Sequence, residues 1–409
     1  MCFQEIPASE GQESVGRAAI GLVCVLALIL CAGCLAPRTL NQVVMAYDRS
    51  VTEGLMEQML LNVARAVHRE PIHFTAVSNI AATYDLRFSA GATPPLGGLD
   101  GGFSLAPIFG ASISENPTIT IVPIEGEEFT QRLLTPFQEH RLILLLRQGY
   151  DIDLMLRLMA HEARIKNGTT HVAYRNLPRM KDEYLVFRRL ALQLSTIQDR
   201  NALYAEPLMF ETSVPLPSAS ITMTSVTELG SENRLAQDPQ TGDYALRQRI
   251  SGRILITNYD PDNLPMAERR RLHEEALQSP ENDVLVDIRA GYPGGESPFH
   301  GFFRLRSFHA MINFLGRSLD DEPEFDVAPD PLFGPNEENP PMTLAIRQSL
   351  TQPSDVDQAI RYRGAYYYVD PAGPYRRWNA EGFRLLYQLF QMTVSEISRA
   401  GIPSLTIAK

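Results

Sequence analysis

The feature that most constrains this chain is an apolar run without charged residues near its beginning, from Ala18 to Gly33. A membrane-spanning helix needs roughly 20 such residues to cross about 30 Å of hydrocarbon, so this run is short for that role. Small residues end the run at Ala32 and Gly33, immediately before Cys34. The pattern therefore favours the hydrophobic region of a secretory signal peptide. A buried apolar helix and a plain transmembrane anchor are the alternatives.

The segment from Leu30 to Cys34 reads Leu-Cys-Ala-Gly-Cys and resembles the lipobox of bacterial lipoproteins. Cys31 stands where that pattern usually has Leu, and Arg17 is the only cation before the apolar run. The resemblance implies that residues 1–33 are a signal peptide and that Cys34 carries the lipid. Such lipoproteins carry several acyl chains, and several chains hold a protein firmly in a membrane.

The cysteine pattern agrees with this expectation. The four cysteines are Cys2, Cys24, Cys31 and Cys34. A mature chain beginning at Cys34 would keep one cysteine, and lipid would occupy it, which excludes a disulfide framework or a thiol nucleophile. Leu35 follows, whereas an Asp at that place commonly retains lipoproteins at the inner membrane. We therefore expect the periplasmic face of the outer membrane, with the inner membrane and the cell surface left open.

Charge and length narrow the function classes further. The net charge of −11 argues against nucleic acid as a partner, because phosphate contacts need clustered Lys and Arg. Residues 34–409 are enough for two domains, and we expect them at 34–210 and 211–409. The second domain contains an acidic, proline-rich stretch at 320–341, which predicts an exposed loop. Residues 228–244 are also predicted to be a loop.

Hydrophobic periodicity predicts a mixture of helices and strands. Val51, Leu55, Met59 and Val63 recur every four residues, which predicts a helix that ends before Pro71. Further helices are expected at 127–134, 141–147, 152–163, 181–198, 266–278, 305–319 and 383–394. Strands are expected at 72–76, 118–122, 250–258, 283–290, 360–368 and 404–408. The fold class is therefore α+β with mainly antiparallel sheet.

No catalytic motif is complete in this sequence. His161-Glu162 and His273-Glu274 begin like the zinc-protease motif but lack the second His four residues after the first. The glycine-rich stretch Gly97–Gly102 has no Lys of a phosphate loop, and a serine-hydrolase elbow is absent. Carboxylate pairs such as Asp151 and Asp153 are frequent by chance in an acidic chain. The sequence therefore predicts no catalytic residue, no metal site and no cofactor.

The most promising surface is a cluster of aromatic and arginine residues near the end of the chain. If 360–368 is one regular strand, alternate residues lie on opposite faces. Tyr362, Tyr366 and Tyr368 would then be buried with Ile360. The candidate partner surface would consist of Arg361, Arg363, Tyr367, Arg376 and Arg377. A core strand, a protein interface and a sugar-binding surface are all compatible with this composition.

Several segments resemble a family of uncharacterised proteobacterial envelope lipoproteins. They include Glu57–Arg65, Asn116–Pro123 (NPTITIVP), Gly126–Pro136 (GEEFTQRLLTP) and Leu305–Gly316. The resemblance implies envelope lipoprotein character and no assigned activity. We expect a membrane-anchored periplasmic lipoprotein that binds or scaffolds another envelope component, with an envelope protein as candidate partner. The alternative is a hydrolase that acts on an envelope polymer.

Overall fold

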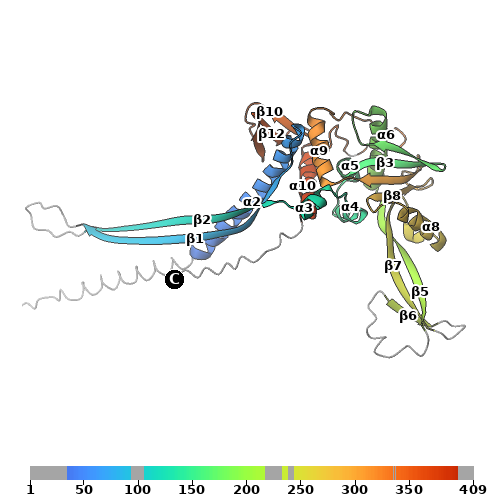
Figure 1. Cartoon of the computed structure of the whole chain (residues 1–409), viewed down its shortest axis with the longest axis horizontal. Coiled ribbons are helices and arrows are strands. Elements are labelled where there is room, and N and C mark those ends of the chain that lie inside the picture. Colours follow the sequence, from blue (N-terminus) through green and yellow to red (C-terminus); the bar gives the residue numbers. More distant parts are fainter. Residues whose placement is uncertain are drawn as a thin grey trace, which may run out of the picture. The chain divides into compact units, whose positions relative to one another are not determined.

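The computed structural model describes residues 35–93, 106–216, 233–237, 244–334, 336 and 338–394 (Figure 1). The chain divides into two compact units, Met1–Glu57 and Gln58–Lys409. Helix α2, Leu35–Val67, contains the boundary between them, and the described part of the first unit is entirely helical. In the second unit Met59 and Val63 are fully buried, as the apolar periodicity predicts. The helix also ends before Pro71, as expected.

A seven-stranded sheet forms the largest element of the second unit. Its strand order is β4-β3-β9-β8-β7-β5, and β6 also pairs with β7. All neighbours are antiparallel except β7 and β8, because helix α8 (Met266–Leu277) connects them as a crossover. The strands are β3 Ala160–Asn167, β4 Thr170–Arg175, β5 Tyr204–Leu216, β6 Asn233–Gln237, β7 Tyr244–Thr257, β8 Asp283–Ile288 and β9 Phe299–Leu305.

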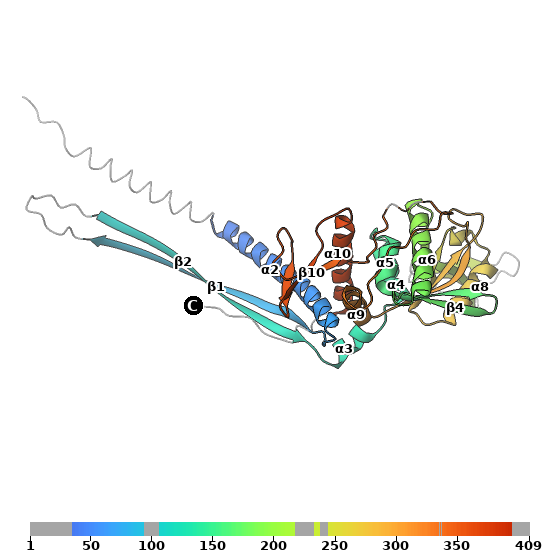
Figure 2. The same ribbon diagram turned by 90° about the horizontal axis from the view of Figure 1, so that it is seen from above.

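Helices cover both faces of this sheet (Figure 2). On one face, Leu272 and Ala276 of α8 pack with Phe302 of β9 in a buried apolar cluster. On the other, the ring of Phe187 from α6 (Lys181–Asp199) lies 5.8 Å from the ring of Phe303, centroid to centroid. Neighbouring residues of a strand face opposite sides. The two helices therefore lie on opposite sides of the sheet.

Two helix predictions extend too far. Helix α4 covers Glu139–Leu146 and α5 covers Ile152–Met159, but residues 160–163, expected to continue α5, begin β3. They pair with β9, and this tertiary pairing overrides the helical pattern. Similarly, the helix expected from residue 305 begins later. Helix α9 covers Phe308–Leu319, because Ser307 caps it by accepting a hydrogen bond from the Ala310 N–H.

The remaining elements form a second packing layer. A small sheet has the order β10-β12-β11, and two further helices accompany it. The rings of Phe74, Phe308 and Phe390 pack together, with the ring centroids of Phe74 and Phe390 4.3 Å apart. The elements are β10 Ile346–Ser349, β11 Ala359–Tyr362, β12 Ala365–Val369, α3 Glu127–Leu134 and α10 Arg376–Thr393. Together with the first sheet they confirm the α+β class.

A long two-stranded ribbon adds to these layers. Strand β1, Phe74–Thr93, pairs antiparallel with β2, Ala106–Ile124, with one irregularity between Val77 and Asn79. The expected short strands at 72–76 and 118–122 correspond to the two ends of this ribbon nearest the flanking helices. Among the described residues, neither strand pairs with any other strand.

Residues 320–341 form an irregular segment, here called the strap, that is buried in part. Their described part, which omits 335 and 337, contains no helix or strand, as expected. The expected exposure holds only in part: Asp321, Asp326 and Leu332 are exposed, but Val327 and Phe333 are 3% and 4% exposed. Glu324 accepts hydrogen bonds from the Tyr184 hydroxyl at 2.9 Å and from the Thr343 N–H at 2.7 Å. Paired in this way, an acidic side chain can be buried at little cost.

The expected domain boundary between residues 210 and 211 lies inside β5, whose partner β7 comes from the other side of that boundary.

Other expectations concern residues that the structure does not describe. Residues 1–34, the stretch Gly97–Gly102 and the strand expected at 404–408 lie outside the described residues. So does most of 228–244, apart from β6 and Tyr244. Within the described part of the chain, no helix is long and apolar enough to cross a membrane.

Candidate functional site

The tyrosine-rich segment is a hairpin, not one strand. Arg363 and Gly364 turn the chain between β11 and β12 with φ angles of 46° and 86°. The turn places Ile360 opposite Tyr367 and Arg361 opposite Tyr366. The residues that share a face therefore differ from those expected for a continuous strand.

Tyr367 lies in the core, which corrects the expectation that it is accessible. It is 0% exposed and packs with Ala64 of α2 and Ala365, with Ile360 and Tyr362 beside them. Its hydroxyl lies 3.2 Å from Nε2 of His68. Burial raises the pKa of the Tyr367 hydroxyl. Tyr367 therefore holds the hairpin against α2 and cannot meet a partner.

The four arginines of the candidate partner surface are exposed. The Arg361 guanidinium lies 5.8 Å from the ring centre of Tyr366, and Arg363 pairs with Glu70. Arg376 and Arg377 occupy the first turn of α10, where Arg377 pairs with Glu381 at 3.1 Å. These four arginines are accessible, as expected, but the buried Tyr367 is not part of the same exposed surface.

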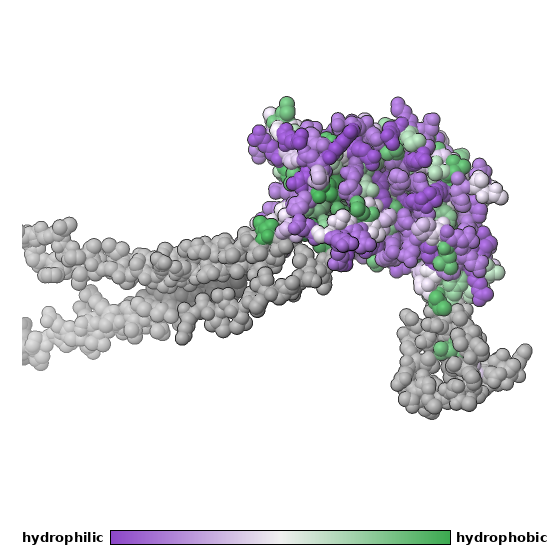
Figure 3. All heavy atoms as spheres, in the orientation of Figure 1, coloured by the Kyte–Doolittle hydropathy of each residue, from purple (hydrophilic) through white to green (hydrophobic). Residues whose placement is uncertain are grey.

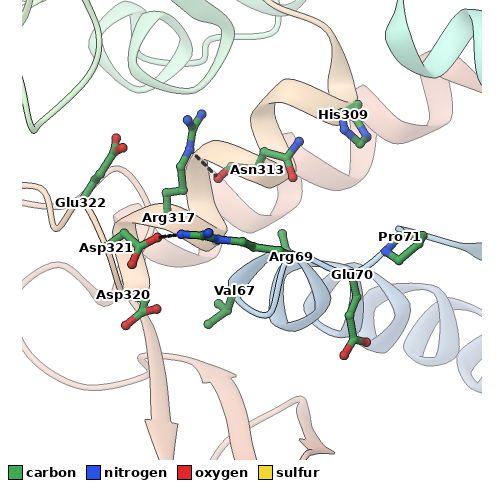
Figure 4. Close-up of a pocket in the computed structure, with 12 residues that line it drawn as sticks. Val67, Arg69, Glu70, Pro71, His309, Asn313, Arg317, Asp320, Asp321 and Glu322 are labelled. Atoms are coloured by element: carbon green, nitrogen blue, oxygen red, sulfur yellow. Dashed lines mark hydrogen bonds and ion pairs between the residues drawn. The ribbon is translucent and has the colours of Figure 1, made fainter.

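An open groove lies next to this hairpin, between the end of α2, helix α9 and the beginning of the strap. Its volume is about 680 Å³, and Figure 4 shows the side chains that line it. The two helices approach closely at Gly316, where an added Cβ would lie 2.7 Å from the Cβ of Ala66. The charged and polar lining residues are Arg69, Glu70, His309, Asn313, Arg317, Asp320, Asp321 and Glu322.

Charges of both signs line the groove, and some are paired. Arg69 contacts the Asp321 carboxylate at 2.9 Å, and this hydrogen bond raises the pKa of Arg69. Glu70 accepts a hydrogen bond from the Tyr362 hydroxyl, and this bond is the main reason why the pKa of Glu70 is lowered. Burial lowers the pKa of His309, which keeps its ring neutral at pH 7. Through Glu70, the groove and the exposed Arg363 form one continuous polar surface.

A second cluster of ionisable groups surrounds His300. Its Nδ1 lies 2.9 Å from Asp287 and its Nε2 lies 2.8 Å from Glu275. Burial opposes a charge on His300, but the two carboxylates raise its pKa overall. Asp287 also accepts a hydrogen bond from Tyr259 at 2.6 Å, and Lys166 pairs with Glu275 at 2.9 Å. These groups are hydrogen-bonded or ion-paired with one another, so the cluster links α8 to three strands of the large sheet, β3, β8 and β9.

A third group of charges is closed to solvent. Arg188 contacts Asp153 at 2.5 Å, and Arg157 lies 3.7 Å from the same carboxylate and 3.5 Å from Glu324. All four side chains are at most 1% exposed. Neighbouring Asp151 caps α5, and burial together with Asp153 raises the pKa of Asp151 to about 7. This group is a structural network, because no substrate can reach it.

The motifs that resemble part of a zinc site do not assemble. His161 lies on β3 instead of a helix. The Nδ1 atom of His273 accepts a hydrogen bond from the backbone of Arg253 at 3.1 Å. In the described ranges, no group of three or more His, Cys, Asp or Glu could hold a metal ion.

Comparison with known proteins gives no relative from which a role could be transferred. No family model matches the chain, and no curated protein or solved structure matches it significantly. The functional argument therefore rests on this chain's own residues. The visible face of the second unit in Figure 3 is mostly hydrophilic, with apolar residues scattered among polar ones.

The sequence did not indicate the groove, because its lining comes from three separate segments. Residues 66–71 are the last residues of α2 and the turn after it, residues 309–317 belong to α9, and residues 320–322 begin the strap. The one local signal was the acidic run at 320–322, which follows α9 directly. No pattern in the sequence predicts the contact between Arg69 and Asp321.

Proposed function

We propose that this chain is a lipid-anchored protein of the outer membrane, facing the periplasm, that binds or scaffolds another envelope component. The apolar run that ends at Ala32-Gly33-Cys34 supports the anchor. Leu35 supports the outer-membrane location, because an Asp at that position commonly retains lipoproteins at the inner membrane. The binding role rests on one observation, the open groove beside the arginine-bearing hairpin.

The groove suits a charged peptide segment of a protein partner. It offers cations such as Arg317 and an acidic group from Asp320 to Glu322 on one surface. Exposed Arg361 and Arg363 extend that surface beyond the groove. Charges of both signs select a partner by complementarity and orient its approach.

A hydrolase is the second candidate, and the groove supports it less well. A general acid needs a carboxyl group whose pKa is raised towards neutrality. In the groove, the pKa of Glu70 is lowered, and Asp321 is paired with Arg69. His309 has the right residue type for a base, but no carboxylate among the described residues pairs with its ring. The charges of the groove are arranged for binding.

The anchor can be tested by metabolic labelling with a fatty-acid analogue. Wild-type protein should incorporate the label and Cys34→Ala should not. Equal labelling of the two proteins would exclude lipidation at Cys34. In fractionated membranes, Leu35→Asp should move the protein from the outer to the inner membrane.

The binding role can be tested with a photo-crosslinking amino acid placed in the groove. Arg317 in α9 is the test position, and Arg270 in α8 is the matched control, since both are exposed arginines on helices. Crosslinking in intact cells should give a discrete product from position 317 only. Arg69→Glu should reduce that product, because it reverses a charge in the groove. Identical crosslinking from both positions would exclude a specific partner at the groove.

A further inference from the structure

Beyond the irregularity between Val77 and Asn79, the β1–β2 ribbon has mostly apolar residues on one face and mostly polar or small residues on the other. In β1, the even positions from 80 to 92 are Ile, Ala, Tyr, Leu, Phe, Ala and Ala. The register pairs them with odd positions of β2 from 119 to 107, which are Ile, Pro, Glu, Ile, Ala, Phe and Pro. Cross-strand partners share a face of a ribbon. One face is therefore apolar, with Glu115 as its single charged residue.

The opposite face is polar or small throughout most of its length. It carries Asn79, Thr83, Asp85, Arg87 and Ser89 in β1. Their partners in β2 include Thr120, Asn116, Ser114 and Ser112. A ribbon immersed in water on both sides has no reason to maintain such an alternation. The pattern requires an apolar environment on one side and a polar one on the other.

The length and edges of the ribbon restrict what can cover the apolar face. At roughly 3.3 Å per residue, residues 79–93 extend over about 50 Å, while about 9–11 strand residues suffice to cross a bilayer. A two-stranded ribbon is marginally stable alone in water. Both of its outer edges lack a strand partner among the described residues. The connecting sequence from 94 to 105 has only one charged residue, Asp100.

We propose that the apolar face of residues 79–93 and 106–120 inserts into a lipid bilayer. The proposal rests on the proposed function, because the lipid at Cys34 would hold the chain at a membrane. Backbone groups in hydrocarbon must be hydrogen-bonded, so neighbouring copies of the chain pair along the free edges of the ribbon. The outer edge of β1 has no proline and keeps all of its N–H groups. The polar face then lies away from the lipid.

Cysteine labelling tests this proposal, since all four native cysteines lie within the first 34 residues. A mature chain lipidated at Cys34 has no free thiol, so an added cysteine is the only labelled site. Phe88→Cys reports the apolar face, and the adjacent Ser89→Cys is its control on the opposite face. Each full-length variant carries an environment-sensitive fluorophore and is reconstituted in vesicles of phosphatidylethanolamine and phosphatidylglycerol. Quenchers are lipids with a nitroxide on the acyl chain, and aqueous iodide.

The label at position 88 should emit at shorter wavelength and be quenched several-fold more by nitroxide lipid than the label at position 89. Iodide should show the reverse order. Equal iodide quenching at both positions would overturn the proposal. So would shielding of position 88 from iodide without quenching by nitroxide lipid, because protein would then cover that face. Labelling of wild-type protein would instead contradict the anchor, which separates failure of the proposed function from failure of insertion.

A second variant tests the apolar face without any label. Leu86→Asp places a charge on that face, and Arg87→Asp places one on the polar face. In a vesicle co-flotation assay, Leu86→Asp in a chain that lacks residues 1–34 should lose membrane association. Arg87→Asp in the same shortened chain should retain it. Equal flotation of the two variants would contradict insertion through this face.

Discussion

The hydroxyl of Tyr367 lies 3.2 Å from the Nε2 atom of His68, so the β11–β12 hairpin is fastened to the end of α2. Tyr367 is fully buried in that contact. The neighbouring Glu70 accepts a hydrogen bond from Tyr362 and pairs with Arg363. The hairpin is therefore attached to Glu70, which lines the groove, while its arginines remain exposed.

Replacing Tyr367 by Ala should lower the free energy of unfolding by about 3–5 kcal/mol, the usual cost of losing a buried aromatic ring. Tyr367→Phe keeps the ring and loses only the contact with His68, so it should cost about 0.5–1.5 kcal/mol. Arg361→Ala, at an exposed position of the same hairpin, is the control and should change little. Urea denaturation measures all three. A Tyr367→Ala variant as stable as wild type would show that the side chain is not core.

Gly316→Ala should destabilise the protein by about 1–3 kcal/mol through overpacking. The new methyl group would lie 2.7 Å from the Cβ of Ala66 and 3.0 Å from backbone atoms, and the backbone cannot move aside. Gly54→Ala is the matched control, because Gly54 also lies in a helix and has no atom within 4 Å of its added Cβ. That control should be neutral or stabilising by about 0.5–1 kcal/mol. Thermal denaturation of both variants checks the contrast.

The His300 cluster should make stability depend on pH. The pKa of His300 is raised in the folded protein from a value of about 6.5, because Asp287 and Glu275 favour its charged form. Its stabilisation is therefore fully present below pH about 6.5 and is lost as the pH rises through the folded pKa. The difference in unfolding free energy between wild type and His300→Gln should decrease over that range. His171→Gln, which removes an exposed imidazole, is the control variant.

Glu324 should determine whether the strap is protected from proteases. Its carboxylate accepts hydrogen bonds from Tyr184 and Thr343 and lies beside Arg157. Glu324→Ala leaves that arginine without one of its buried counter-charges, so the strap should detach. Limited proteolysis should then cut within 325–341 much faster than in wild type. The exposed neighbour Asp326→Ala should leave the cleavage rate unchanged.

The parts of the fold that follow from local patterns were predictable. Helix α3 spans the predicted residues Glu127–Leu134, because two acidic residues begin it and an apolar stripe follows. The predicted strand at 360–368 failed because Gly364 permits a turn inside an otherwise strand-like run. The central part of the ribbon was missed, since its apolar face uses Ala, which contrasts weakly with Ser and Gly. The groove depends on contacts between distant segments, and its one local signal was the acidic run at 320–322.

The ion pair between Arg157 and Glu324 joins residues 167 positions apart in the chain. During synthesis of the chain, Arg157 emerges well before Glu324. Until the later segment arrives, the interior around α5 holds a cation without one of its counter-charges, and burial of that cation is unfavourable. Completion of the core therefore depends on the last third of the polypeptide, and long sequence separation of this kind slows folding. A fragment that ends at residue 210 should consequently be retained by chaperones or degraded rather than accumulate as an independent folded product.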